Sequence, residues 1–451
     1  MGMTAQAHRP AKVLQNRHIQ FIAIGGAIGA GLFLGSGQAI AQAGPAVLGA
    51  YALAGAVVFL MARALGELAL NRPDTATIST HIDDLVGPWA GFITGWSYWL
   101  IWVLVGIAEI TAVGVFMRFW FPDLPQWISA LVTLSALYAA NRFGVRLFGE
   151  LEFWLTLIKV VAIIGLVLVG GAMVFLHLGP AGQKADIANL WSHGGFMPHG
   201  WAGLLGVLPV ALFAFGGTEL VGVTAAEAED PQKALPKAIN GVILRILLFY
   251  VASLGVVMAV APWTVFSGGE SPFVMVFDRA GLPAAAGVIN FVVLTAVISS
   301  CNSGVYATGR TLMSLAERRQ APALLGSMDA RGLPVPAMTA SVGAMLVGVL
   351  LNYLFPEQVL GYVMSLVAAL LLWTWVMVVV AHLRFRRASR GKATAFPMPF
   401  FPASTIVVFA FVALILGIMA FDPGSRPVFY TAVAWFGVMG AAAFARFRKR
   451  G

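Results

Sequence analysis

Long apolar segments alternate with short polar segments along the whole chain. A helix needs about 20 apolar residues to cross the hydrocarbon core of a bilayer. The pattern predicts twelve such helices, at 17–42, 46–70, 88–119, 125–141, 150–177, 201–224, 238–261, 281–306, 335–354, 357–383, 401–421 and 427–447. The segment 88–119 is long enough to require a tilted helix, whereas 125–141 is short.

Composition leads to the same fold class. Hydrophobic residues make up 59% of the chain and charged residues only 10%, with a mean hydropathy of +0.86. A soluble domain carries roughly 25% charged residues. We therefore expect an all-α, polytopic membrane protein. The polar and basic segment 1–15 runs directly into the first apolar segment, which we expect to be an uncleaved helix.

The 28 Lys and Arg residues are unevenly distributed. If the N-terminus lies in the cytoplasm, 23 of them fall in cytoplasmic segments or at the cytoplasmic ends of predicted helices, 4 fall on the external side, and one, Lys159, lies deep inside a predicted helix. This asymmetry is typical of membrane proteins and favours twelve helices with both termini in the cytoplasm. It also accounts for the net charge of +9, so we expect lipid headgroups, and no nucleic acid, as partners of the basic residues.

The first predicted helix contains an unusual run of glycine. FIAIGGAIGAGLFLGSG has six glycines within thirteen residues, between Gly25 and Gly37. Close packing is one explanation, because small residues let membrane helices approach each other. The other explanation is an unwound stretch inside the membrane, whose backbone groups face a cavity and bind a ligand.

The sixth predicted helix carries a similar interruption, FAFGGTEL, between Phe213 and Leu220. The second interruption lies five helices after the first, so the two occupy matching places in two halves of five helices. Paired interruptions of this kind are typical of inverted-repeat transporters with a binding site at the bilayer midplane. Exposed helix N-termini at such a break are expected to receive a substrate carboxylate.

Seven ordered motifs resemble a known family. They are NRHIQFIAIGGAIGAGLFLGSG, AGPAVLGAYALAG, RALGEL, GPWAGFITGWSYW, FGELEFWLTLIKV, FAFGGTELVGVTAAEAEDPQKALPKAIN, and SPFVMVF with NFVVLTAVISSCNSGVYATGR. With them the chain resembles the amino acid–polyamine–organocation superfamily and, within it, the bacterial amino acid permease family. The resemblance implies a five-plus-five inverted repeat followed by two extra helices, alternating access and uptake coupled to protons.

The resemblance also implies a division of the chain and a location. We expect a cytoplasmic segment at 1–16, a first repeat at 17–177, a second repeat at 201–383, two further helices at 401–447 and a cytoplasmic end at 448–451. The expected location is the bacterial cytoplasmic (inner) membrane. The sequence shows no metal-ligand cluster or nucleophile motif, so we expect neither an enzyme nor a cofactor. The resemblance implies that the coupling ion is the proton.

The expected substrate-binding residues follow from the two interruptions and the polar residues of nearby helices. They are Ile24, Gly25, Ala27, Gly29, Ala30, Gly31, Glu109, Phe215, Gly216, Thr218, Glu219 and Asn302. For Phe215 we expect an aromatic gate beside the break in the sixth helix. Asn302 either lines the pathway or forms a hydrogen bond between helices.

Three ionisable residues inside predicted helices are the candidates for proton coupling: Lys159, Glu109 and Glu219. Charged residues at this depth usually mark ion or proton pathways. The FWLTLIKV match implies that Lys159 contacts the unwound part of the first helix, although a structural lysine is the alternative. Glu109 and Glu219 bind substrate, carry a proton or serve a structural role. Glu67, Glu150 and Glu152 lie near helix ends, where they could pair with Arg63, Arg142 or Arg146.

The motifs point to two groups of permeases. GPWAGFITGWSYW and SSCNSG resemble the D-serine/D-alanine/glycine type, and FGGTELVG resembles the proline and histidine type. We expect a small neutral amino acid as the substrate and no obligate protein partner. Glu109 stands where the first group is expected to have Asp, so proline, histidine and cationic substrates stay open, as does an exchanger.

Overall fold

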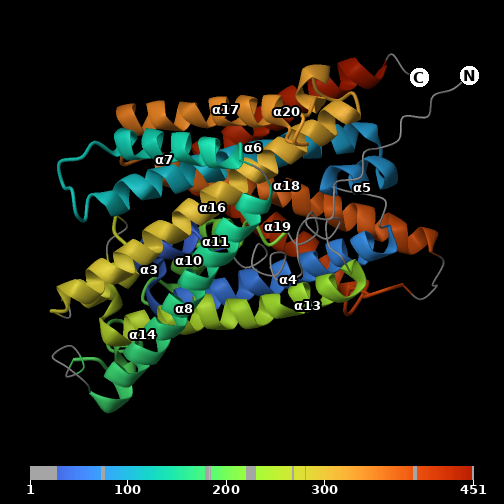
Figure 1. Ribbon diagram of the computed structural model, residues 1–451. Helices are drawn as coiled ribbons and strands as arrows, with labels where there is room; N and C mark the ends of the chain where they lie inside the picture. The colour runs from blue at the N-terminus through green and yellow to red at the C-terminus, as the bar shows by residue number, and fades with distance from the viewer. Residues whose placement is uncertain are drawn as a thin grey trace, which may run out of the picture.

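A computed structural model describes residues 28–72, 77–143, 145–177, 182, 184–219, 230–266, 269–279, 281–389 and 394–448. Over these residues the fold is all α, without a strand (Figure 1). The membrane-length helices are α4 (Val47–Asn71), α6 (Pro88–Met117), α8 (Val145–Leu176), α16 (Pro283–Glu317), α17 (Val335–Leu354), α18 (Val359–Ala388), α19 (Ala403–Phe421) and α20 (Arg426–Phe447), with a further span formed by α13 (Pro231–Arg245), η4 (Ile246–Ala252) and α14 (Ser253–Val260). These apolar helices confirm the predicted polytopic fold.

Shorter elements account for the remaining predicted spans and the connections. Three predicted spans correspond to α2 (Ala30–Phe33) with α3 (Gly35–Ala43), to α7 (Gln126–Asn141), and to α10 (Gly200–Gly206) with α11 (Leu208–Ala214). The connecting helices are η1 (Gly44–Ala46), α5 (Ile78–Leu85), η2 (Ile187–Leu190), η5 (Trp263–Val265), α15 (Pro272–Arg279) and η6 (Ala323–Gly326). The division into two repeats stays a prediction.

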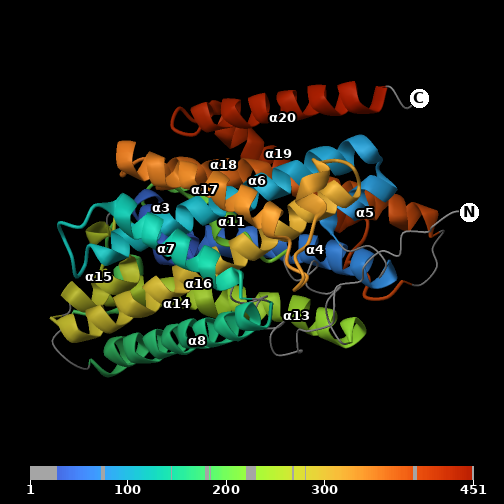
Figure 2. The same ribbon diagram turned by 45° about the horizontal axis from the view of Figure 1, so that its top comes forward.

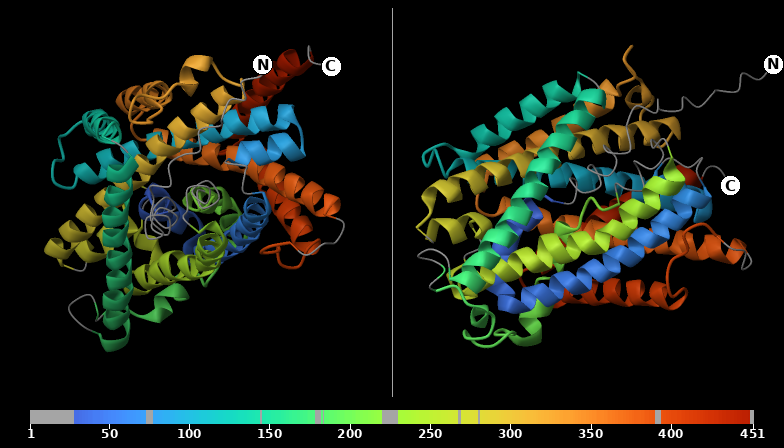
Figure 3. Two further views of the ribbon diagram at one scale, coloured as in Figure 1. Left: turned by 45° about the vertical axis from the view of Figure 1, so that its right-hand side comes forward. Right: turned by 60° about the horizontal axis from the view of Figure 1, so that its bottom comes forward.

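Helix α6 forms the centre of the bundle. It begins at Pro88, whose fixed φ suits a first helical turn, directly after Gly87 at φ 136°. In its most apolar 18-residue window 83% of the residues are buried, against 33% for α8 and 17% for α20. Figure 2 shows α20 at one edge of the bundle and α8 at the opposite edge, and Figure 3 shows α8 crossing its outside. The apolar surfaces of α8 and α20 therefore suit contact with lipid.

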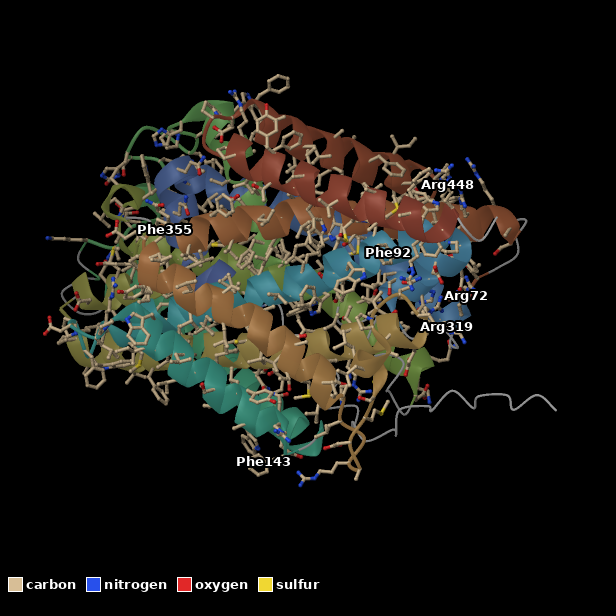
Figure 4. The ribbon with its side chains drawn as sticks, turned by 90° about the horizontal axis from the view of Figure 1, so that it is seen from above. Arg72, Phe92, Phe143, Arg319, Phe355 and Arg448 are labelled. Atoms are coloured by element: carbon tan, nitrogen blue, oxygen red, sulfur yellow. The ribbon has the colours of Figure 1, made fainter. Side chains whose placement is uncertain are left out.

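The two ends of the bundle differ in charge. Figure 4 shows Arg72, Arg319 and Arg448 at one end, here called the basic end, and Phe355 at the other. At the basic end, α5 is attached to its neighbours by ion pairs: Arg318 binds Asp83, and Arg72 lies 3.1 Å from Asp84. The basic end thus contains compact charge networks and not only solvated loops.

Glu67 of α4 lies in one of these networks. Arg63 interacts with it electrostatically, but the hydrogen-bonded partners of Glu67 are other residues. The side chain is fully buried. Its carboxylate lies 2.8 Å from His382 Nε2 and 2.9 Å from Arg386 Nη1, both on α18, and accepts hydrogen bonds from the Thr394 hydroxyl and the Met398 N–H. Helix order alone did not show that α18 and the segment after it fold back over α4.

Candidate functional site

Two half-helices meet inside the bundle. The helical stretch 30–43 is about 21 Å long at 1.5 Å per residue, which is too short to cross a bilayer. The stretch Gly200–Ala214 is similarly short. A Cβ on Gly31 would lie 2.6 Å from the Ala214 Cα, so the end of α11 and the start of α2 are in close contact. Helix α2 begins at Ala30 and helix α11 ends at Ala214, at the two glycine runs. The residues on the far side of each predicted interruption, before 28 and from 220 to 229, lie outside the described residues.

The backbone N–H at the start of α2 already has an acceptor. The Ala30 nitrogen lies 3.0 Å and 3.2 Å from the two carboxylate oxygens of Glu109, which belongs to α6. The Ser300 hydroxyl of α16 donates to the same carboxylate at 2.8 Å. Glu109 is 2% exposed. The Ala30 N–H therefore donates to a carboxylate of the protein itself, at the place where the sequence predicts the carboxylate of a substrate.

Lys159 lies beside this contact and is completely buried. Its Nζ donates to the carbonyl oxygen of Ile28 at 3.2 Å, directly before the first turn of α2. The predicted contact between this lysine and the interrupted first helix is thus present. Lys159 also interacts electrostatically with Glu109 and Glu152, so the cation lies close to two carboxyl groups.

Glu152 is not at a solvated helix end, and its expected pairing with arginine was wrong. The side chain is fully buried. Its Oε1 accepts hydrogen bonds from Ser299 of α16 at 2.8 Å and from Thr156 at 3.3 Å. Sequence reasoning missed this residue, although a separation of seven places Glu152 and Lys159 two turns apart on one face of a helix.

The interruption of the sixth span brings its predicted residues together in a turn. Helix α11 ends at Ala214, and Gly217 adopts φ 97°, a conformation that favours glycine. Glu219 is 2% exposed, and its Oε2 accepts a hydrogen bond from the Gly217 N–H at 3.2 Å. Gly216 and Thr218 lie in the same turn. This carboxylate is therefore held by its own turn.

Phe215 packs against aromatic side chains. Its ring lies 4.6 Å from Tyr250 and 5.9 Å from Tyr51, centroid to centroid. The Tyr250 hydroxyl donates to the Ala214 carbonyl at 2.6 Å. These contacts hold the end of α11 against α4 and η4. The role of Phe215 as a gate stays a prediction.

Asn302 lies in a contact between α16 and α7. Its Oδ1 accepts a hydrogen bond from Asn141 Nδ2 at 2.8 Å. This is the helix–helix interaction that the sequence left open. The predicted residues Ile24, Gly25 and Ala27 lie outside the described residues.

A cavity of about 1400 Å³ opens at the end opposite the basic end. We call it the vestibule. Its lining includes Leu34 of the first half-helix and Thr111, two residues after Glu109. Gln38 and Gln42 of α3 and Gln126 of α7 also line it. The vestibule thus reaches the helices that carry the Glu109–Ala30 contact.

Comparison with known proteins gives matches over nearly the full length. The model of the amino acid permease family matches residues 18–449. The uncharacterized amino acid permease YtnA of Bacillus subtilis is 45% identical over 99% of this chain and 98% of its own length. The amino-acid permease AapA of the same organism is 45% identical over 96% and 94%. The aromatic amino acid transport protein AroP of Escherichia coli K12 is 44% identical over 95% and 93%.

Proposed function

The chain belongs to the amino acid permease family, and on that premise we propose that it is a proton-coupled symporter for a small neutral amino acid. It is a multi-pass membrane transporter and not an enzyme. The observation that carries the proposal is the contact of Glu109 with the Ala30 N–H beside the buried Lys159. It joins a proton-binding side chain to the expected position of the substrate carboxylate.

Coupling follows from competition for one backbone amide. The ionised Glu109 carboxylate is a strong acceptor for the Ala30 N–H, and a protonated carboxyl group is a weaker one. When Glu109 takes up a proton, a substrate carboxylate replaces it at Ala30. Lys159, bound to the Ile28 carbonyl, then faces one ionised acid fewer. Proton and substrate thus bind together, which is the requirement for symport.

Large buried side chains favour a small substrate. Trp102 lies seven residues before Glu109 on α6, and Trp375 lies one turn after Leu371, whose Cδ1 is 3.6 Å from the position of a Cβ on Gly216. Both tryptophans are 1% exposed. Both rings therefore lie inside the bundle, on the helix that carries Glu109 and on the helix that contacts the turn at Gly216. Glycine, alanine and serine, including the D-enantiomers of the last two, are the substrates we propose.

The relatives favour a second candidate. AroP is named as an aromatic amino acid transport protein, and its identity to this chain makes an aromatic substrate the main alternative. Proline, histidine and cationic amino acids follow from the sequence motifs. An exchanger would use the same site without proton coupling.

We also propose the orientation and the membrane. The basic end faces the cytoplasm, in accordance with the positive-inside rule, and the vestibule faces outward. Both termini are then cytoplasmic, and the protein belongs in a bacterial cytoplasmic membrane. Alternating access opens the half-helices first to the vestibule and then to the basic end.

Uptake into proteoliposomes tests the proposal. With an imposed inward proton gradient, the purified protein should accumulate radiolabelled glycine, alanine or serine, and a protonophore should abolish the accumulation. Unlabelled aromatic, proline, histidine and cationic amino acids serve as competitors. Uptake of none of the amino acids would refute transport by this site. Uptake that strictly required internal amino acid would identify an exchanger.

A further inference from the structure

We propose that Glu152 is a second proton-carrying residue of this transporter, placed between the Lys159–Glu109 pair and the basic end. The inference rests on the proposed proton coupling and adds a residue to it. Its basis is the position of a fully buried acid beside a fully buried lysine, in a part of α8 that sequence reasoning took for a helix end.

The carboxyl group of Glu152 is only half satisfied. Oε1 accepts hydrogen bonds from Ser299 and Thr156. Oε2 has no partner within hydrogen-bond distance among the described residues, although the Ser303 hydroxyl, which also lacks a partner at that distance, lies near the carboxyl group. An ionised carboxylate offers about four acceptor sites. Leaving one oxygen of a buried ion unpaired is costly, and a proton on that oxygen removes the cost. The site is therefore suited to a carboxyl group that gains and loses a proton.

The charges around Lys159 also leave room for one proton. Lys159 interacts electrostatically with Glu109 and with Glu152, so one cation lies near two acids. With both acids ionised the cluster carries one excess negative charge in a buried site, and one proton shared between the acids neutralises it. Two other helices, α7 and α14, also pack on α8, and neither contains Asp, Glu, Lys, Arg or His. The hydroxyl of Tyr250, on the neighbouring element η4, donates to the Ala214 carbonyl.

Adjacent serines on α16 connect the two acids. Ser299 donates to Glu152, and Ser300 donates to Glu109, each at 2.8 Å. Figure 1 shows α16 passing between α6 and α8, the helices that carry Glu109 and Glu152. The two carboxyl groups are thus held by consecutive residues of one helix, on two different neighbours.

The acids lie at different depths. Glu152 is seven residues from the start of α8 at Val145, about 10 Å along the axis, and Lys159 is about 21 Å from it. Glu109 belongs to the helix segment that lines the vestibule at Thr111. A proton from external water binds Glu109, passes to Glu152 and leaves to water at the basic end. Glu152 is then a carboxylate again, and no further reactant is needed.

The substitution Glu152→Gln tests the inference. The glutamine keeps the shape of a protonated glutamate and carries no transferable proton. In proteoliposomes, accumulation driven by a proton gradient should fall at least roughly tenfold, while exchange of internal for external amino acid without a gradient stays within about twofold of wild type. Glu152→Asp, which restores an acid, should recover part of the accumulation. Glu317→Gln, an exposed glutamate at the end of α16, is the control and should behave as wild type.

Each other result has a definite meaning. Wild-type accumulation and an unchanged pH profile in Glu152→Gln would refute the role of Glu152 and leave the proposed coupling intact. Loss of exchange together with accumulation, in a variant of normal melting temperature, would show a structural role and refute it too. A wild-type protein whose uptake ignores the proton gradient would overturn both the proposed coupling and this inference.

Discussion

The Glu109 carboxylate holds the backbone N–H of Ala30 with both of its oxygens, at 3.0 Å and 3.2 Å. The contact joins α6 to the first residue of a half-helix across 79 positions of sequence. Both residues are shielded from solvent: Ala30 is fully buried and Glu109 nearly so. A change in the charge of Glu109 therefore changes the strength of the hydrogen bond that the Ala30 N–H donates.

Replacing Glu109 by glutamine should separate substrate binding from proton coupling. The amide oxygen still accepts a hydrogen bond from Ala30, but it is a weaker competitor than a carboxylate. Proton-driven accumulation should fall at least roughly tenfold, while substrate affinity is equal to wild type or higher and no longer varies with pH. Titration of the purified variant with substrate at several pH values measures the affinity. A variant with the pH dependence of wild type would contradict the competition.

A side chain at Gly29 should block the site. A Cβ there would overlap Glu109 Oε1 and lie 2.8 Å from Ser300 Oγ. We expect Gly29→Val to lose substrate binding, because the side chain displaces the Glu109 carboxylate and fills the space for a substrate carboxylate. Gly417→Val is the matched control, since a Cβ on Gly417 meets nothing within 4 Å. Thermal-shift measurements with substrate compare the two, and retained affinity in Gly29→Val would move the site elsewhere.

Lys159→Ala should abolish proton-driven uptake more than it weakens binding. The substitution removes the donor to the Ile28 carbonyl and the cation beside Glu109. Accumulation should drop at least roughly tenfold and substrate affinity by less than about threefold. Since removing one partner of a buried charge pair costs about 3–5 kcal/mol, the melting temperature must be measured as well. Near-normal, pH-dependent uptake by a folded variant would exclude the proposed role.

Glu219→Gln should weaken the response of uptake to pH. The side chain is buried in the turn that follows α11 and binds the Gly217 N–H through one oxygen. Glutamine preserves that hydrogen bond and removes the charge. We expect a flatter pH profile of uptake or a changed substrate affinity, with the fold intact. Kinetics equal to wild type at every pH would assign Glu219 to the structure of the turn alone.

His81 in the connecting helix α5 should make stability depend on pH. Burial, with Arg72 nearby, lowers the pKa of His81 from 6.5 to about 4. The histidine is neutral in the folded protein and binds a proton more readily when unfolded. Its contribution is therefore fully present above pH 6.5 and is lost as the pH falls toward 4, by up to about 3 kcal/mol.

The melting temperature of detergent-purified protein as a function of pH tests this contribution. His81→Gln should lose less stability than wild type between pH 6.5 and 4. His193→Gln replaces an exposed histidine and should leave the acid dependence unchanged. Parallel curves for wild type and His81→Gln would show that His81 does not titrate in this range.

Much of the fold follows from the sequence because lipid imposes a simple length rule. Helices such as α6 and α17 were predicted within a few residues, and the glycine runs marked the ends at Ala30 and Ala214. A contact of Lys159 with the glycine-rich part of the first predicted helix was also anticipated, and the structure gives Ile28 as the partner. The helix bounds and the glycine runs follow from local sequence pattern. The contact of Lys159 follows from a family motif that includes this residue.

The partners of buried acids could not be predicted in the same way. Glu67 and Glu152 lie near arginines in sequence, yet they bind α18 and α16 respectively. Their partners depend on which helices pack together, and hydrophobic periodicity does not specify neighbours. The polar pair Ser299–Ser300 was visible inside an apolar span, and its orientation toward two different helices was not.

The network at Glu67 restricts how the transporter can open. Four partners from α18 and the segment after it converge on one buried carboxylate of α4. A motion that pulled α4 away from α18 at this level would leave a buried ion unpaired. The free energy of the separated state would rise by about 3–5 kcal/mol. A cycle that keeps the basic ends of α4 and α18 as one rigid piece avoids that barrier. The hinge of the transport cycle is then expected closer to the bilayer centre than Glu67.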